Sequence, residues 1–182
     1  MHSKVAMVAG LIVLLLVNWS IVGKERHLKA GRIVYLELAP VDPRSLMQGD
    51  YMALRFRIAN EAYLALPKQK KKYRRAEIIS DDGRLVVSLD EKSVGQFRRI
   101  ENELPLANNE ILLRYRVRNG RLKFASNAFF FEEGRGKLYE AARYGRFRVD
   151  ANGELLLTSL YDNKLHRLGS DPQRSPPDKA MP

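Results

Sequence analysis

Residues 113–124 read LRYRVRNGRLKF and contain the strongest local structural signal of the chain, Asn119-Gly120. Apolar and basic side chains alternate on both sides of Asn119-Gly120, as they do when successive side chains of a strand point to opposite faces of a sheet. An Asn-Gly pair favours the two positive φ angles of a type I′ turn. We therefore predict a hairpin with one apolar face and one basic face.

Further strands are predicted on both sides of this hairpin, where runs of β-forming residues end at turn signals. They comprise 31–38, 51–58, 76–80 and 84–89 around Asp81-Asp82-Gly83, 129–131 as a buried strand, and 147–149 and 155–160 around Asn152-Gly153. Residues 137–144 (KLYEAARY) predict a helix. Together these elements predict a mostly β domain, a β-sandwich or partly open barrel with one short helix.

A weak internal repeat is a further prediction. Residues 54–58 match residues 113–117 in residue type at every position. The match suggests that segments 46–92 and 104–165 are duplicated halves of the domain. The alternative is that amphipathic strands resemble one another without a common origin.

The N-terminal segment has the composition of a membrane span. Val5–Val22 contains no charged residue, and its length approaches the ~20 residues that cross a bilayer. Trp19 has the place of an interfacial aromatic residue, and Lys24 that of a headgroup anchor. A cleaved signal peptide is the alternative, but no small-residue cleavage site follows the apolar run. We expect an uncleaved signal anchor.

These features divide the chain into successive parts. We predict a leader at 1–4, a transmembrane anchor at 5–23, a juxtamembrane linker at 24–31, a β-rich domain at 32–168 and a disordered tail at 169–182. Because the leader is so short, we expect the long C-terminal part to be translocated. The domain is therefore predicted on the periplasmic, extracytoplasmic side of the inner membrane.

Composition excludes several chemistries. The 182-residue chain has no cysteine, which removes disulfides, zinc-thiolate sites and thiol nucleophiles. Its histidines, His2, His27 and His166, are scattered along the sequence, so we predict no metal site. No phosphate-binding glycine loop is present, and we predict no cofactor. The formal net charge of +11 suits an anionic partner.

Basic residues gather on one face of the predicted sheet. This predicted anion-binding face consists of Arg55, Arg57, Arg114, Arg116, Arg118, Arg121, Lys123, Arg146 and Arg148. It would bind phosphates of anionic lipid or glycan. The alternative is that acidic neighbours neutralise it, namely Glu37, Glu77, Glu132 or Glu154. Nucleic acid is disfavoured, because the aromatic residues alternate with the arginines and face the core.

Residues 42–56 (DPRSLMQGDYMALRF) resemble the signature of a bacterial family named for the motif Gly-Asp-Tyr-x-x-Leu-x-Tyr, with Phe56 in place of the final tyrosine. The resemblance covers roughly residues 32–165. It implies an interaction role for the matching positions Asp42, Arg44, Gly49, Asp50, Tyr51, Leu54, Glu133, Tyr139 and Tyr144. Members of the family are membrane-anchored proteins without an established activity. They look like companions of multi-pass membrane proteins, so the resemblance implies an accessory role.

An enzyme is the third hypothesis. Residues 45–50 are also similar to the segment after the nucleophile in type I signal peptidases, but Val41 occupies the position of the serine, so we reject peptidase activity. Asp50 either stabilises its loop or acts as a functional carboxylate. With Glu132 or Glu133 it would form a hydrolase pair.

The leading hypothesis is a non-enzymatic accessory protein of the cell envelope that has no catalytic residue and partners an integral membrane protein. An envelope protein that binds anionic lipid or glycan through its basic face is the second hypothesis.

Overall fold

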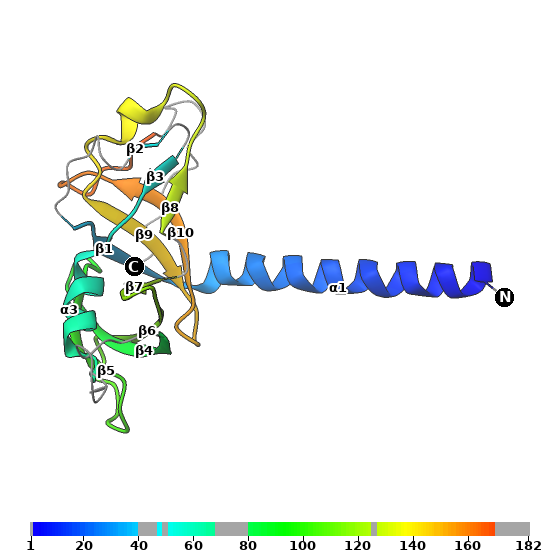
Figure 1. Cartoon of the computed structure of the whole chain (residues 1–182), viewed down its shortest axis with the longest axis horizontal. Coiled ribbons are helices and arrows are strands. Elements are labelled where there is room, and N and C mark those ends of the chain that lie inside the picture. Colours follow the sequence, from blue (N-terminus) through cyan, green and yellow to red (C-terminus); the bar gives the residue numbers. More distant parts are fainter. Residues whose placement is uncertain (1, 40–46, 49–50, 68–79, 125–126, 170–182) are drawn as a thin grey trace, which may run out of the picture.

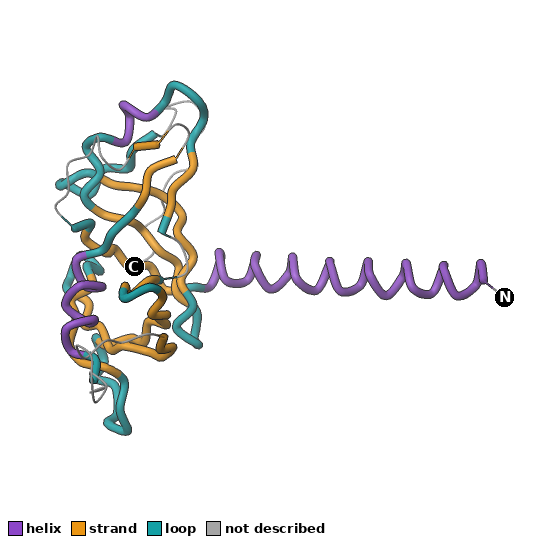
Figure 2. Tube along the Cα trace, viewed as in Figure 1, coloured by secondary structure: helices purple, strands orange, loops and turns teal. Residues whose placement is uncertain are grey.

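The computed structural model of the chain describes residues 2–39, 47–48, 51–67, 80–124 and 127–169. A long helix, α1 (His2–Ala30), projects from a β-rich domain, and the N-terminus lies at the far end of this helix (Figure 1). Strands make up most of the domain (Figure 2). The predicted combination of an N-terminal apolar helix and a mostly β domain is confirmed.

From Met7 to Val22, helix α1 carries exposed, mostly apolar side chains on all sides. Within it, Met7–Ala30 is long and apolar enough to cross a membrane, and none of this stretch is buried in the protein. Trp19 is 84% exposed. The helix continues as far as Ala30, so the segment predicted as a linker at 24–31 is helical up to its last residue.

The described strands form three antiparallel sheets. The first has the order β1 (Arg32–Glu37), β9 (Tyr144–Val149), β10 (Leu155–Tyr161). The second has the order β2 (Met47–Gln48), β3 (Tyr51–Ala53), β8 (Ala128–Phe130). The third has the order β5 (Gly95–Ile100), β4 (Ser80–Leu89), β6 (Glu110–Arg118), β7 (Arg121–Lys123). Helix α3 (Arg57–Ala65) and a 3-10 turn, η1 (Gly136–Tyr139), complete the domain.

The sheets curl into a half-barrel around one core (Figure 1). The backbone N–H of Arg114 in β6 donates to the carbonyl of Gly153, at a distance of 2.8 Å, and joins the third sheet to the β9–β10 turn. Phe56 lies at the centre, 1% exposed, with its ring centroid 5.3 Å from that of Phe147 and 5.9 Å from that of Phe124. The partly open barrel predicted from the sequence is the observed architecture.

The hairpin predicted at 113–124 is confirmed. Asn119 and Gly120 have φ angles of 53° and 68°, as a type I′ turn requires. In the register of β6 and β7, Arg118 pairs with Arg121 and Arg116 with Lys123. The second predicted hairpin, around Asn152-Gly153, is also present as β9 and β10.

The strand predicted at 51–58 is wrong beyond its first residues. β3 ends at Ala53, and α3 begins at Arg57. Burial does alternate along this segment as the sequence suggested, because Leu54, Phe56 and Ile58 are buried and the arginines between them are exposed. Within α3, however, the buried positions Ile58, Ala59 and Ala62 have helical spacing, and packing of that face decides the structure.

The turn predicted at Asp81-Asp82-Gly83 is also wrong. β4 runs without a break through these residues, and Gly83 pairs with Tyr115 of β6. A Cβ on Gly83 would lie 2.8 Å from the Tyr115 hydroxyl, so this glycine provides room for a cross-strand tyrosine. Residues 76–79, predicted as the first strand of this hairpin, lie outside the described residues.

Two other predictions need correction. The helix predicted at 137–144 is only the 3-10 turn η1, and β9 already begins at Tyr144. The strand at 129–131 exists as β8, but it is not buried, because Phe130 is 74% exposed. The two segments that suggested an internal repeat differ in structure, since 54–58 leads into α3 and 113–117 lies in β6. The duplication stays a prediction.

Candidate functional site

The junction between α1 and the domain is tightly built. The Nε2–H of His27 donates to the carbonyl of Arg148 at 2.8 Å. The Arg148 guanidinium in turn donates to the carbonyl of Gly31 at 2.9 Å, and the N–H of Gly31 donates to the carbonyl of His27 at 3.0 Å. Gly31 is buried, and a Cβ there would lie 2.6 Å from the His27 carbonyl oxygen. The chain therefore passes directly from α1 into β1, and hydrogen bonds with Arg148 of β9 hold this junction in place.

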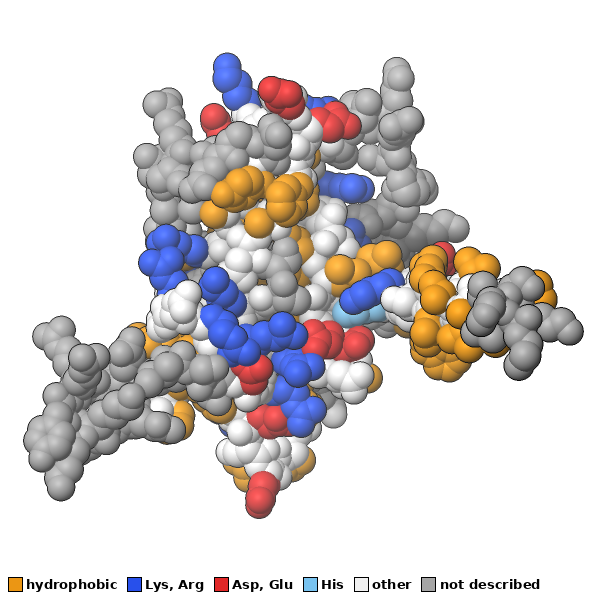
Figure 3. Space-filling view, turned by 45° about the vertical axis from the view of Figure 1, so that its right-hand side comes forward, with side chains coloured by type: hydrophobic (Ala, Val, Ile, Leu, Met, Phe, Trp, Pro, Cys, Tyr) orange, Lys and Arg blue, Asp and Glu red, His pale blue; other side chains and the backbone are white. Residues whose placement is uncertain are grey.

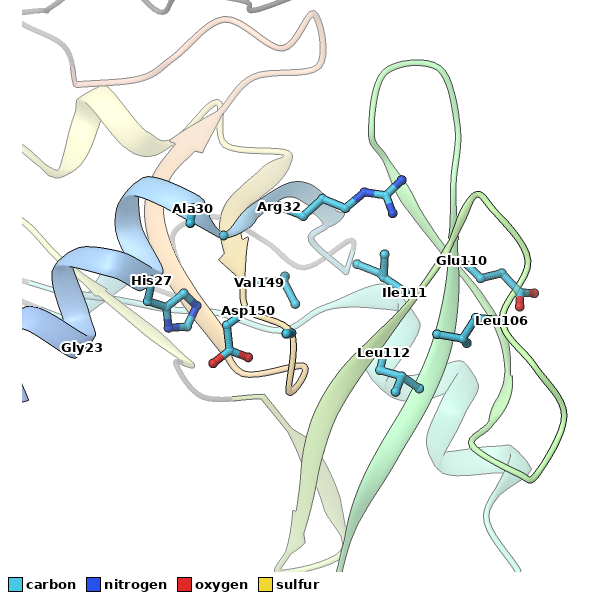
Figure 4. Close-up of a pocket in the computed structure, with 12 residues that line it drawn as sticks. Gly23, His27, Ala30, Arg32, Leu106, Glu110, Ile111, Leu112, Val149 and Asp150 are labelled. Carbon is cyan, nitrogen blue, oxygen red and sulfur yellow. The ribbon is translucent and has the colours of Figure 1, made fainter.

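A pocket of about 550 Å³ opens beside this junction (Figure 4). In Figure 4, His27 and Asp150 lie on one side of it and the apolar side chains of Leu106 and Leu112 lie on the other. Its lining combines apolar groups with a few ionisable ones: Gly23, His27, Ala30, Gly31, Arg32, Leu106, Glu110, Ile111, Leu112, Val149, Asp150 and Ala151. We call this the junction pocket.

Both carboxylates of the junction pocket accept hydrogen bonds from other groups of the protein. Glu110 accepts a hydrogen bond from the backbone N–H of Ala107 and two from the Arg99 guanidinium, both at 3.0 Å, and these hydrogen bonds hold its pKa below the usual value. Asp150 accepts the backbone N–H groups of Asn152 and Glu154 at 2.9 Å each. Arg32 forms no ion pair within the described part of the chain. The two carboxylates are therefore satisfied by groups of the protein itself.

The motif residues that the structure describes are mainly packing residues. Leu54 is 2% exposed in the core, and the Tyr51 ring lies 5.7 Å from that of Phe130. Tyr139 is buried against Phe129 and Phe131, with ring centroids 5.1 and 5.3 Å away.

The other described motif residues do not form a common site with Tyr51, Leu54 and Tyr139. Tyr144 begins β9, half-buried, opposite Glu37, and Glu133 is exposed. Asp42, Arg44, Gly49 and Asp50 lie outside the described residues, so the role of Asp50 stays a prediction. Glu132, its suggested partner, forms an ion pair with Arg135 at 3.0 Å.

Part of the predicted basic face lies on β6 and β7, and acidic residues neutralise some of it. The exposed basic residues there are Arg114, Arg116, Arg118, Arg121 and Lys123. Figure 3 shows Lys and Arg side chains gathered on the face beside the base of α1, with Asp and Glu among them. Arg114 pairs with Glu154 at 2.6 Å, as the sequence suggested. Arg118 pairs with Asp82 at 2.5 Å, and this hydrogen bond lowers the pKa of Asp82.

Other members of the predicted face are found elsewhere or lack an acidic partner. Arg116, Arg121 and Lys123 form no ion pair with any described residue. Arg57 belongs to α3 and binds Glu37 at 3.0 Å. The remaining predicted members do not lie on the β6–β7 face: Arg55 is exposed between β3 and α3, Arg146 is buried against the Tyr161 hydroxyl, and Arg148 holds the junction.

Sequence reasoning missed the junction. His27 and Arg148 are 121 residues apart in the chain, and no local pattern connects them. The one available signal was Gly31, a glycine between a helical run and a strand. No group of His, Asp or Glu residues in the described segments is arranged to hold a metal ion.

The fold and this junction define a class of protein in which a β-rich half-barrel domain is built directly onto an apolar N-terminal helix. The family model described as GDYXXLXY protein matches residues 13–160, so the chain belongs to the GDYXXLXY family. No curated protein and no solved structure matches the chain.

Proposed function

We propose that the chain is a membrane-anchored, non-enzymatic accessory protein of the bacterial cell envelope that binds an integral membrane protein. In this proposal α1 spans the inner membrane, and the domain lies on its extracytoplasmic side. The observation that carries it is the exposed, apolar α1, which passes into the domain at Gly31 without a flexible linker.

The exposed surface of α1 is largely apolar. Large apolar side chains cover every side of the helix, and in water such a surface is strongly unfavourable. A bilayer core of ~30 Å accommodates about 20 helical residues, which fits Met7–Ala30. The hydrogen bonds at Gly31 then hold the domain close to the membrane surface.

The junction pocket gives this proposal a contact site. It is lined by Gly23 and His27 of α1 and by Leu106 and Leu112 of the domain, so it lies where the anchor would leave the bilayer. An apolar segment of a multi-pass protein, emerging at the same level, would fit this lining. Leu106 is 44% exposed, which leaves apolar area for such a contact.

Affinity purification from detergent-solubilised membranes tests the accessory role. We expect the full-length protein to recover one multi-pass membrane protein in near-stoichiometric amount. Leu106→Glu should reduce this recovery by about tenfold, since a charge in an apolar contact costs at least ~1.4 kcal/mol. Leu104→Glu is the matched control, because Leu104 is exposed on the same loop but does not line the pocket. Recovery of the protein alone, or equal recovery with both variants, contradicts the proposal.

Binding to anionic headgroups is a second candidate function. It is supported by the gathering of basic side chains beside the base of α1 (Figure 3). In nanodiscs that contain phosphatidylglycerol, acetylation of Lys29, at the base of α1, by a water-soluble reagent should be slower than in phosphatidylcholine discs. Lys92, an exposed lysine between β4 and β5, should react equally in both. Equal rates for Lys29 in the two discs contradict this function.

A further inference from the structure

A second, smaller pocket lies between α3 and the β6–β7 hairpin. Its volume is about 340 Å³, at the lower end of the ~300–1,000 Å³ typical of ligand pockets. The chain after β3 forms one wall, the first two turns of α3 another, and the hairpin turn a third. The lining residues are Ala53, Leu54, Arg55, Phe56, Ala59, Asn60, Tyr63, Gly120, Arg121, Leu122, Lys123 and Asn127. We call this the hairpin pocket.

Positive charge is concentrated at the hairpin pocket. Arg55, Arg121 and Lys123 are all exposed, and none forms an ion pair with a described residue. No carboxylate is among the described residues that line it. Like charges brought together in this way repel one another, and an anionic group bound between them would relieve the repulsion. Guanidinium groups bind carboxylates and phosphates with two parallel hydrogen bonds.

The remaining lining suits a ring that carries hydroxyl groups. Asn60 and Asn127 supply amide donors and acceptors, and Tyr63 supplies an aromatic ring and a hydroxyl. The Tyr63 hydroxyl lies 3.7 Å from the position that a Cβ on Gly120 would take, so it reaches the hairpin turn. Leu54, Phe56 and Leu122 are buried behind these groups and fix the floor. The pocket thus combines an anion site with hydrogen-bonding groups and one stacking surface.

The location of the pocket indicates where its ligand comes from. α3, which supplies Asn60 and Tyr63, lies on the side of the domain opposite to the direction in which α1 projects (Figure 1). If α1 spans the membrane, this side faces away from the bilayer. A lipid headgroup of the same membrane is therefore a poor occupant, and a water-borne ligand is the better one.

We propose that the hairpin pocket binds a soluble anionic sugar, with a phosphate or carboxylate between the three cations and the sugar ring against Tyr63. This inference is independent of the headgroup-binding candidate and of the accessory role. It assigns a defined pocket and a soluble ligand class to Arg55, Arg121 and Lys123.

Isothermal titration calorimetry of the full-length protein in phosphatidylcholine nanodiscs tests the proposal. The probes are glucose 6-phosphate, glucuronate, glucose and inorganic phosphate. We expect saturable binding of at least one of the two anionic sugars, and affinities for glucose and for inorganic phosphate that are weaker by about tenfold or more. Tyr63→Phe, which keeps the ring, should weaken sugar binding without altering the affinity for phosphate.

Matched charge variants separate this site from general electrostatics. The triple variant Arg55→Gln, Arg121→Gln, Lys123→Gln should lose about tenfold or more in affinity. The control variant Lys92→Gln, Lys137→Gln, Lys164→Gln removes the same charge from exposed positions outside the pocket and should keep its affinity.

Three results overturn the proposal: no saturable binding of either anionic sugar, equal loss in both triple variants, or inorganic phosphate bound as tightly as the sugars, which would indicate an adventitious ion only. Co-purification of the membrane partner by the pocket variant is the separate readout for the accessory role, so failure of the sugar site and failure of that role are distinguishable.

Discussion

Gly153, in the turn between β9 and β10, shows what a single residue contributes to this fold. Its φ is +81°, a conformation that side chains disfavour. A Cβ there would lie 2.9 Å from the backbone carbonyl oxygen of Leu112, which cannot move without disturbing β6. The Gly153 carbonyl also accepts the Arg114 N–H that joins two sheets. The turn can therefore approach β6 only because this residue has no side chain.

Gly153→Ala should lower the free energy of unfolding by more than the ~1–2 kcal/mol that a left-handed conformation alone costs. Gly134→Ala is the control, because Gly134 has a φ of +77° and nothing within 4 Å of its Cβ position. Chemical unfolding of both variants in detergent measures the difference. If both variants lose the same free energy of unfolding, the close approach of Gly153 to Leu112 does not contribute to stability.

Phe56 fills the centre of the core between Phe124 and Phe147. Replacing it by alanine should therefore lower the free energy of unfolding by about 3–5 kcal/mol. Phe130→Ala removes a ring that is 74% exposed and should cost far less. Thermal unfolding compares the two, and similar losses would contradict the position assigned to Phe56 in the core.

At the scale of elements, local alternation can predict burial and still miss the secondary structure. The alternation of aromatic residues with arginines correctly marked Phe56 as a core residue, yet α3 begins at the next residue. The decision between helix and strand depends on the packing of Ile58 and Ala62, which local alternation does not report. Gly83 was taken for a turn because its real constraint, Tyr115, lies on another strand. The Asn119-Gly120 hairpin was predictable because its determinants are local.

The Arg99–Glu110 pair connects β5 to the start of β6 and should make stability depend on pH. Because the pKa of Glu110 is lowered in the folded state, the unfolded state binds more protons in acid. The stabilisation is complete above the ordinary glutamate pKa of ~4.3 and is lost as the pH falls through the folded value. Wild type should therefore be more stable than Glu110→Gln at pH 7, and the difference should shrink below pH ~4. A difference in urea midpoint that is constant from pH 7 to pH 3 would contradict this role.

At the scale of the whole molecule, the helix was predictable and its attachment was not. An uncharged apolar run is visible in sequence, whereas the hydrogen bonds that Arg148 forms with His27 and Gly31 join residues 121 and 117 positions apart. The same limit applies to the hairpin pocket, where the segment after β3 meets the β6–β7 turn. Contacts between segments so distant in sequence form only when the sheets pack around one core, so no local pattern reports them.

The junction predicts a fixed angle between anchor and domain. Because the chain has no cysteine, spin labels at Leu28→Cys and Lys92→Cys report one distance. We expect a narrow distance distribution in nanodiscs, and a broader one after His27→Ala removes the hydrogen bond to Arg148. Distributions of equal width would show that His27 does not hold the domain.

Labelling of a single cysteine tests the proposal that α1 anchors the domain outside the cytoplasm. Leu64→Cys places a thiol at an exposed position of α3 in a chain with no other cysteine. In spheroplasts, a membrane-impermeant maleimide should label this protein before lysis, and the labelled chain should sediment with the membranes. Labelling only after lysis, or recovery of the chain in the soluble fraction, would contradict the account.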